Sequence, residues 1–192
     1  MDTLNVTKTR TGYQVHDTST APSDSRPFIE DKQKEFGFVP NLIGVFADSP
    51  QAVEAYVTLG RLFESTTLSP IEVNVVMLAV SAANSCDYCM AAHTGLANMH
   101  KVPQDVIEAL RSGKPIADPK LQALRAFTQD MTLSRGRPNQ ESLEAFYSAG
   151  YTRRNALEVN LGITMKTLSN YTNHLSETPL DEQFKSFEWS AR

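Results

Sequence analysis

Apolar residues recur every three or four positions along most of the chain, separated by short polar stretches. In the segment 53–63, for example, they fall on one face of a helix. No segment shows the apolar–polar alternation of a half-buried strand, and no Asn-Gly or Asp-Gly pair marks a hairpin. The pattern predicts an all-α protein of about eight to ten mostly short helices joined by tight loops.

Capping residues, prolines and glycines mark the helix boundaries. Ser, Asp, Asn and Thr side chains accept hydrogen bonds from the first amides of a helix, proline fits its first turn, and glycine ends it. These signals predict helix starts near Ser25, Asn41, Ser49, Ser69, Cys86, Pro103, Asp118, Asn139 and Thr152, with stops at Gly37, Gly113 and Gly150.

The helix that starts at Ser69 is expected to be central. Ser69 and Glu72 form a capping box, in which each side chain bonds the backbone amide of the other residue. The residues from Val73 to Val80 are apolar nearly all round the helix. Such a helix is typically buried on every side.

The first 25 residues are rich in Thr, Ser, Asp and Pro and lack this periodicity. They are interpreted as a polar N-terminal arm, residues 1–25, ahead of a single helical domain, residues 26–192. Two interpretations of the arm stay open: it wraps a neighbouring subunit, or it is disordered. His16 lies in this arm with no partner that the sequence identifies.

Charge and cysteine content limit the partners and the cellular compartment that the sequence predicts. A net charge of −4 gives no reason to expect nucleic acid or an anionic membrane as partner. The N-terminal segment has no apolar core of a secretory signal, and no run is long enough to span a membrane. Both cysteines belong to one C-x-x-C pair, which leaves none for a structural disulfide framework and points to a reducing cytoplasm.

The strongest chemical signal is the segment 86–93, which holds Cys86, Cys89 and, one helical turn later, His93. A helix that begins near Cys86 places Cys89 in its first turn, where unpaired amides and the helix dipole favour an anion. His93 lies on the same face and can take or return a proton. Both features are expected to lower the pKa of Cys89, whose thiolate is the reactive form.

These parts suit the reduction of a peroxide without metal or flavin. The Cys89 thiolate attacks the O–O bond, the alcohol leaves with a proton supplied through His93, and Cys89 becomes a sulfenic acid. Cys86 then displaces water to form a disulfide, which a second dithiol reopens by exchange. Because Cys86 lies at the helix end, its sulfur is predicted to be the more exposed one and the site of that exchange.

Other interpretations of the pair are weaker. Zinc sites use the same spacing, but at a rise of ~1.5 Å per residue the candidate ligand His100 would lie roughly 20 Å from Cys86 along one helix. Two inert core cysteines are disfavoured by the polar residues around them. Tyr88, between the thiols, either donates a hydrogen bond in the pocket or simply packs.

The segment Leu68–His93, with L-S-P-x-E, A-V-S-A-A-N and C-D-Y-C-M-A-A-H, resembles the carboxymuconolactone decarboxylase superfamily. Within it, the similarity is to the branch of AhpD-type alkylhydroperoxidases. A looser similarity to longer "peroxidase-related" members extends from Phe38 to Tyr171. The resemblance implies an AhpD-like helical fold, assembly as a homotrimer or homohexamer, and reduction of hydroperoxides by the C-x-x-C pair.

The resemblance also implies a role for each residue of the pair. Cys89 corresponds to the peroxidatic cysteine, and Cys86 to the cysteine that accepts electrons from a dithiol, such as a lipoylated or thioredoxin-like protein. His93 corresponds to a member of the proton relay. These implied roles agree with the chemistry inferred from the residues themselves.

One departure concerns the relay. The family's relay glutamate, on the helix before the cysteines, corresponds to Asn74, and an amide cannot relay a proton by titrating. Glu72 is near in sequence but turned about 200° away on a helix, so the capping box explains it better. Where the best-known members carry histidine, this chain has Tyr88. Asn74 and Tyr88 are candidate relay or pocket residues, and weaker or differently supported peroxidase activity is expected.

Three rival functions stay open beside the peroxidase. A disulfide reductase or redox sensor would exchange disulfides with little peroxide turnover. A decarboxylase or isomerase of the superfamily would have no need of paired thiols. A non-enzymatic binding protein would tolerate the amide of Asn74 in place of a carboxylate.

Overall fold

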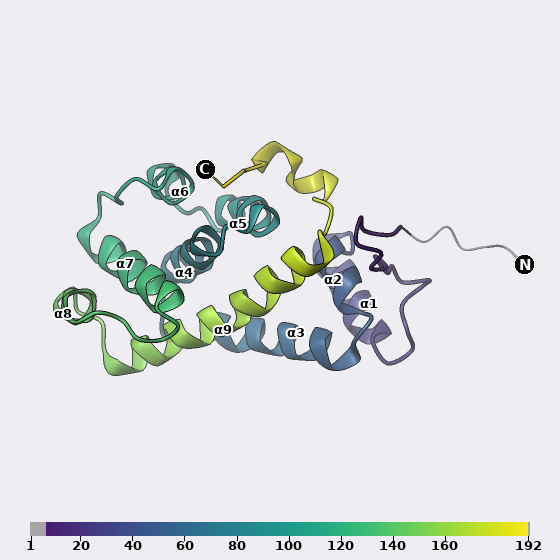
Figure 1. Ribbon diagram of the computed structural model, residues 1–192, viewed down its shortest axis with the longest axis horizontal. Helices are drawn as coiled ribbons and strands as arrows, with labels where there is room; N and C mark the ends of the chain where they lie inside the picture. Colours follow the sequence, from purple (N-terminus) through teal and green to yellow (C-terminus); the bar gives the residue numbers. More distant parts are fainter. Residues whose placement is uncertain (1–6, 192) are drawn as a thin grey trace, which may run out of the picture.

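The computed structural model describes residues 7–191 as an assembly of helices (Figure 1). In chain order these are α1 Arg26–Phe36, α2 Asn41–Phe46, α3 Pro50–Glu64, α4 Pro70–Ala83, α5 Asp87–Met99, α6 Gln104–Ser112, α7 Pro119–Leu133, α8 Gln140–Ser148, α9 Arg153–Ser176 and the 3-10 helix η1 Glu182–Phe187. Within the described range, strand-like pairing is limited to an isolated bridge between Lys8 and Gln14. The all-α prediction is confirmed.

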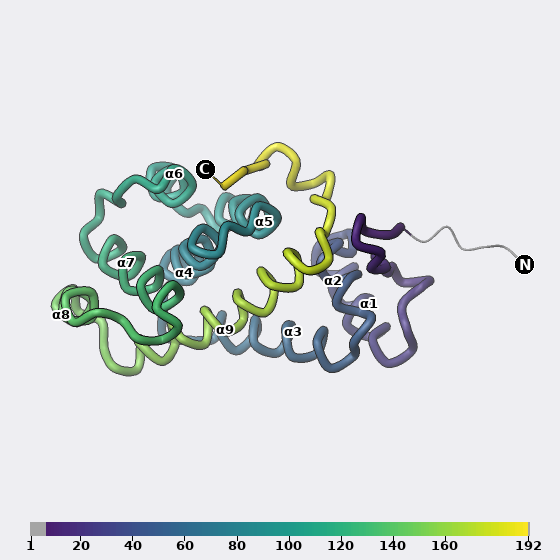
Figure 2. The backbone as a smooth tube through the Cα atoms, viewed as in Figure 1, coloured from purple at the N-terminus to yellow at the C-terminus, as the bar shows by residue number. Residues whose placement is uncertain are grey.

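Helix α4 lies at the centre of the larger core. It packs against α5, α6, α7 and α9, and Figure 2 shows α4 and α5 enclosed by these neighbours. Every residue from Glu72 to Ser81 is buried, as the apolar pattern predicted. The capping box that starts the helix is also present, with Ser69 and Glu72 each bonding the other's backbone amide.

Most of the predicted caps are present, with one exception. Ser49, Asp118, Asn139 and Thr152 each accept a hydrogen bond from an amide in the first turn of α3, α7, α8 and α9. Ser25 precedes α1 but its side chain does not cap it. That hydroxyl is buried and donates instead to the carbonyl of Ala47 at 2.7 Å, so it joins α1 to the end of α2.

A smaller apolar cluster joins α1, α2, the start of α3 and the start of α5, and it contains both cysteines. Helices α3 and α9 run side by side below it (Figures 1 and 2). Gly162 of α9 permits this approach, because a Cβ atom there would lie 2.6 Å from Cζ of Phe63 in α3. The two helices therefore meet closely enough for both to contribute side chains around the cysteines.

The described part of the N-terminal arm packs on its own chain. The amide of His16 donates to the carbonyl of Gly44 at 3.2 Å. Its buried ring lies 2.9 Å from the carbonyl oxygen of Thr20 and 2.8 Å from Oδ1 of Asp48, so the structure gives His16 partners that the sequence did not identify. Contacts of the arm with a neighbouring subunit stay a prediction, and its residues 1–6 lie outside the described range.

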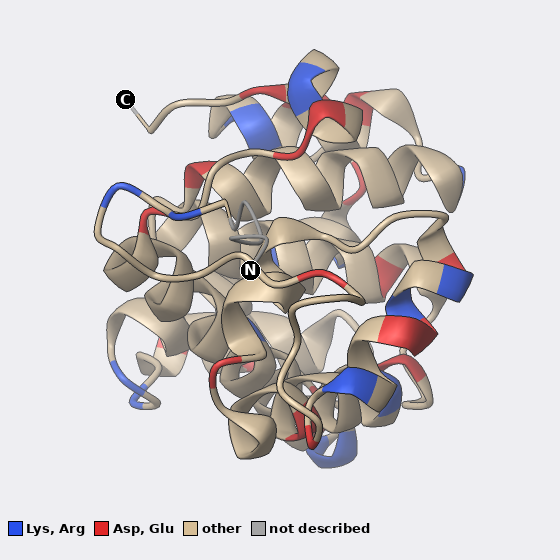
Figure 3. Ribbon diagram, turned by 90° about the vertical axis from the view of Figure 1, so that its right-hand side faces the viewer, with Lys and Arg blue, Asp and Glu red and all other residues tan. Residues whose placement is uncertain are grey.

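In the view of Figure 3, Lys and Arg positions are interspersed with Asp and Glu positions along the ribbon. None of the helices in residues 7–191 combines the length and the apolar character that crossing a membrane requires.

The C-terminal segment packs on the helical domain. The 3-10 helix η1 lies against α5. The indole of Trp189 fixes the following segment by donating to the carbonyl of Arg111 at 2.8 Å.

Candidate active site

The turn between α4 and α5 presents the two cysteines. Ser85 adopts a positive φ of 53°, and the amide of Cys86 donates to the carbonyl of Ser81 at 2.9 Å. Cys86 is then the residue before α5, and Cys89 lies in the first turn of that helix. The predicted helix start and the position of Cys89 are thus confirmed, and both cysteines are free thiols.

Both sulfurs lie under α9. The side-chain amide of Asn173 donates to Sγ of Cys89 at 3.2 Å and approaches Sγ of Cys86 at 3.8 Å. The hydroxyl of Ser169 lies 3.9 Å from Sγ of Cys89. Each cysteine is only 1% exposed. The expectation that Cys86 is the more exposed sulfur was therefore wrong, because the end of α9 covers it.

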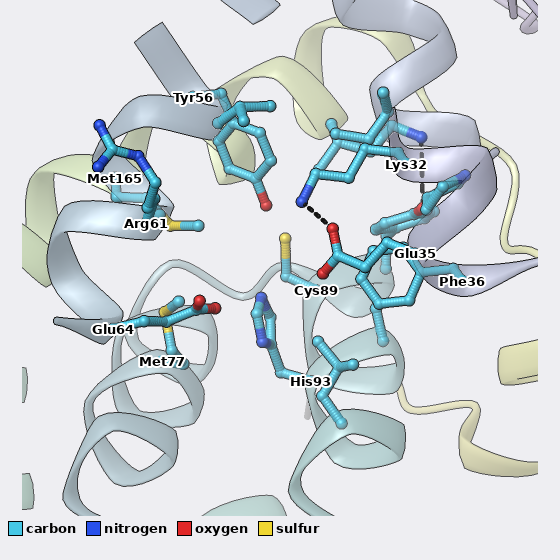
Figure 4. Close-up of a pocket in the computed structure, with 18 of the residues that line it drawn as sticks. Lys32, Glu35, Phe36, Tyr56, Arg61, Glu64, Met77, Cys89, His93 and Met165 are labelled. Atoms are coloured by element: carbon cyan, nitrogen blue, oxygen red, sulfur yellow. Dashed lines mark hydrogen bonds and ion pairs between the residues drawn. The ribbon is translucent and has the colours of Figure 1, made fainter. Parts of the chain in front are cut away.

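Cys89 and not Cys86 lines a cavity of about 380 Å³. Its lining is mostly apolar and comes from α1, α2, α3, α4, α5, α9 and η1, with Leu42, Ile43, Val57, Met77, Leu96 and Met165 among the lining residues. Charged residues of α1 and α3 also line it, and Lys32 and Glu35 form an ion pair of 2.6 Å there. In Figure 4 the sulfur of Cys89 and the ring of His93 face the same space, with Tyr56 and this ion pair across from them.

His93 is a buried, neutral base. Burial lowers its pKa well below the ordinary value, and the positive charge of Lys166 and the nearby His100 add to that effect. At neutral pH the ring can accept a proton but carries no positive charge. Its position in the cavity beside Cys89 agrees with a proton-transfer role, although neither sulfur is its hydrogen-bond partner in the described structure.

The two thiols differ in acidity. Burial by itself would raise the pKa of Cys89, but the neighbouring Cys86 thiol, the positive charge of Lys166 and the hydroxyl of Ser169 outweigh it and hold that pKa well below the ordinary thiol value. The interaction with Cys89 and burial raise the pKa of Cys86. Cys89 is thus the thiolate and Cys86 the thiol. The cation near Cys89 is Lys166, contrary to the expectation that His93 would lower its pKa.

The two remaining candidates differ in position. Tyr88 lines the cavity, but its hydroxyl donates to Oδ2 of Asp181 at 2.6 Å and accepts from the amide of Leu42 at 3.3 Å. Asn74 is buried in α4 away from the lining of the cavity. Its amide donates to the carbonyl of Pro70 at 2.8 Å and lies 3.1 Å from Nδ1 of His100.

Tyr88→Phe tests whether this hydroxyl is structural. Removing it leaves the buried carboxylate of Asp181 without one donor, so the free energy of unfolding is expected to fall by about 1–3 kcal/mol. The pH dependence of Cys89 alkylation should not change. Urea unfolding and alkylation measure the two effects, with the partly exposed Tyr147→Phe as control. Unchanged stability with slower chemistry would instead support a relay role.

Sequence reasoning missed the contribution of α9. Lys166, Ser169, Asn170 and Asn173 are all buried and recur at the spacing of one helical face. This polar repeat was the available signal. The apolar residues of the same helix do not all face inward, since Leu157 is 73% exposed.

The comparisons with known proteins agree with this site and fold. The sequence pattern described as the carboxymuconolactone decarboxylase family matches residues 50–130, which include both cysteines and His93. No curated protein matches the chain significantly.

Several solved structures share the fold. The AhpD core structure of an uncharacterized peroxidase-related protein from Ralstonia eutropha JMP134 has a TM-score of 0.78 and 24% identity, over 90% of this chain and 93% of that one. A peroxidase-related protein from Silicibacter sp. TM1040 has a TM-score of 0.70 and 18% identity, over 85% and 88%. The debrominase Bmp8 in complex with 2,3,4-tribromopyrrole has a TM-score of 0.74 and 19% identity, over 97% and 96%.

Proposed function

We propose that this protein is a thiol-dependent peroxidase acting through Cys89 and Cys86. The match of residues 50–130 to the carboxymuconolactone decarboxylase family pattern and the AhpD-like fold support this proposal. The observation that carries the proposal is the pairing of a thiolate and a thiol, with the thiolate alone facing a cavity. Two buried cysteines that only filled the core would have no need to differ in acidity or in access to a cavity.

In the proposed reaction the Cys89 thiolate attacks the terminal oxygen of the hydroperoxide and takes the OH group as a sulfenic acid, while the O–O bond breaks. The leaving alkoxide receives a proton delivered through His93 and departs as the alcohol. The Cys86 thiol then attacks the sulfenic sulfur, and its proton leaves with the hydroxyl as water. Each cycle transfers two electrons to the peroxide and leaves a Cys86–Cys89 disulfide.

The cavity favours organic hydroperoxides over hydrogen peroxide. Its volume of about 380 Å³ lies within the range of small-molecule sites, and its lining is mostly apolar. An alkyl or aryl group of a hydroperoxide would displace water from this lining, which is favourable, whereas hydrogen peroxide has no apolar surface to bury. Selectivity is expected to come from KM because this apolar contact is remote from the reacting oxygen atoms.

The reductant is a dithiol that can reach a buried disulfide. Both sulfurs are covered, and the cavity leads to Cys89. A slender dithiol arm, as on a lipoylated protein, is therefore favoured over the exposed surface dithiol of a thioredoxin-like protein. We place the reaction in the cytoplasm, where such dithiols are kept reduced.

A homotrimer or homohexamer is the proposed assembly. Helix α9 carries a second stripe, defined here as the outer stripe, about half a turn from Lys166 and Asn173: Leu157, Leu161, Thr164, Leu168, Tyr171 and Leu175. These positions alternate steps of four and three residues, as in a helix–helix seam. Within the outer stripe, Leu161 and Leu168 are partly buried and also pack against the chain's own apolar clusters. Leu157, Tyr171 and Leu175 are 73%, 62% and 63% exposed. Apolar residues this exposed on one helix are typical of an interface between subunits.

A second candidate reaction uses the same site. The similarity to a debrominase bound to a tribromopyrrole supports reductive removal of bromine from a small aromatic compound, because the same apolar cavity would take a flat ring. The Cys89 thiolate and the Cys86 thiol would supply two electrons, the proton of Cys86 would become the hydrogen that replaces bromine on the ring carbon, and bromide would be released as the disulfide forms.

One experiment separates these functions. Consumption of cumene hydroperoxide, hydrogen peroxide and tribromopyrrole is measured with dihydrolipoamide as reductant, together with reduction of a small disulfide. The peroxidase proposal expects turnover of cumene hydroperoxide with a lower KM than hydrogen peroxide. Bromide release without peroxide turnover would favour the second candidate. Disulfide exchange alone would indicate a reductase or sensor and would refute the peroxidase.

A further inference from the structure

Lys166 is a buried cation that the reaction scheme above does not use. Its residue exposure is 0%, and its Nζ atom has no hydrogen-bond partner within the described residues. Removing an ammonium group from water costs several kcal/mol unless a nearby charge compensates it. The surroundings of Lys166 should therefore contain a compensating negative charge.

The position of Lys166 on α9 identifies that charge. Ser169 follows it by three residues and Asn173 by seven, so all three lie on one helical face. The other two are the residues that approach Cys89, at 3.9 and 3.2 Å from its sulfur. The face that carries Lys166 is thus the face that covers the cysteines.

Other polar atoms on this face are also unpaired. Nδ2 of Asn170 and Oδ1 of Asn173 are buried without hydrogen-bond partners among the described residues. Two unpaired donor groups, on Lys166 and Asn170, therefore stand on the side of α9 that faces the sulfurs. Such a concentration of donors stabilises an anion better than a neutral thiol.

Lys166 is the buried cation near Cys89. The other titratable or charged groups of this region are Cys86, just before α5, and those that line the cavity from α1, α3 and α5: Asp31, Lys32, Glu35, Tyr56, Arg61, Glu64, Tyr88 and His93. Arg61 is the other cation of this region without an ion-pair partner among the described residues, but its side chain is exposed to solvent, which screens its charge. Lys32 and Glu35 neutralise each other in an ion pair. Burial raises the pKa of Tyr56 and lowers that of His93, which keeps both neutral at pH 7.

We propose that Lys166 is a positioning residue whose ammonium group is the counter-charge of the Cys89 thiolate, held by α9 outside the lining of the cavity. The reactive pair is then a thiolate beside a neutral imidazole, with the compensating cation kept out of the substrate's space. The inference deepens the proposed peroxidase, and it concerns the resting reduced protein, so it can be tested without turnover.

The test is the pH dependence of alkylation of the reduced protein by iodoacetamide, with the modified cysteine identified by mass spectrometry. In wild type, Cys89 should react fast well below pH 8. Lys166→Met keeps the length of the side chain and removes the charge. At pH 6 it is expected to slow alkylation at least about tenfold, equivalent to a rise of about one pKa unit.

Two further variants complete the design. Lys166→Arg keeps the charge and should retain most of the fast reaction. Lys185→Met removes an exposed lysine from η1 and should match wild type. Because Lys166→Met removes the counter-charge, Cys89 is expected to become a neutral thiol, which leaves no uncompensated buried charge. The variant is therefore expected to fold, and circular dichroism checks this.

The proposal is overturned if folded Lys166→Met has the wild-type alkylation profile. If that variant does not fold, Lys166→Gln is compared with Lys166→Arg in the same assay, and equal profiles for the two would overturn it as well. Because no peroxide is present, failure here leaves the peroxidase proposal standing. Conversely, a protein that consumes no peroxide can still show the predicted alkylation shift.

Discussion

Cys89→Ser abolishes hydroperoxide consumption in the proposed mechanism, with an expected loss of more than about 10³-fold in turnover. The serine hydroxyl remains protonated and cannot attack the O–O bond at neutral pH. Since Cys89 is the thiolate that faces the cavity, no other sulfur replaces it. Steady-state consumption of cumene hydroperoxide with dihydrolipoamide measures the loss.

Cys86→Ser is the matched control. It keeps a thiolate in the cavity but removes the thiol that condenses with the oxidised sulfur, so the expected result is one slow turnover ending in a sulfenic acid. The turnover is slowed because the Cys86 thiol also helps to hold the pKa of Cys89 low. A dimedone adduct at Cys89 after one equivalent of peroxide identifies that product. Equal steady-state rates in Cys89→Ser and wild type would refute the mechanism.

Phe146→Ala has the largest expected effect on stability. Its ring is fully buried and stacked between Phe127 and Tyr151, with ring centroids 4.2 and 4.5 Å away. Truncating such a residue costs about 3–5 kcal/mol, because the cavity left behind closes only in part. For a domain of this size, Tm should fall by roughly 6–20 °C.

The control for that prediction is Leu133→Ala at the end of α7, where the leucine is 67% exposed. Its truncation should change the free energy of unfolding by less than about 0.5 kcal/mol. Thermal unfolding followed by circular dichroism gives both values. A loss of under 1 kcal/mol for Phe146→Ala would mean that the stacked cluster repacks around the gap, contrary to the prediction.

Much of the fold was predictable because its signals are local. Capping side chains, prolines and stop glycines act within one turn, so the starts of α3, α4, α7, α8 and α9 follow from the sequence. The cap of α1 was not predictable in this way. The hydroxyl of Ser25 donates instead to the carbonyl of Ala47, a residue that only tertiary folding brings near.

The part of the site that lies at the start of α5 was predictable from the sequence, whereas the part that α9 contributes was not. The spacing of Cys86, Cys89 and His93 gives their order on one helix, and the identity of the thiolate agrees with that order. Its proposed counter-charge is Lys166, 77 residues later by sequence number (166 − 89). No local rule brings such a pair together, since their proximity depends on how α9 crosses α5.

The prediction that Cys86 is the more exposed sulfur failed for the same reason, because exposure depends on tertiary packing. A residue at a helix end is normally open to solvent, but Cys86 is 1% exposed because Asn173 and the rest of the α9 end lie over it. The part of α9 near the sulfurs also buries a polar face, with Lys166, Ser169 and Asn173 on it. A helix that covers a charged site places polar groups inward and leaves apolar ones for another surface.

The two-sided character of α9 links assembly to reactivity. A single rigid rod, whose diameter with side chains is about 10–12 Å, separates the outer stripe from the donors above the sulfurs. A neighbouring subunit that packs on the outer stripe would fix the position and rotation of α9. It would thereby also fix the distance between the ammonium group of Lys166 and the thiolate of Cys89. In the proposed assembly, dilution to separate subunits is therefore expected to raise the pKa of Cys89, even though no residue around it has been altered.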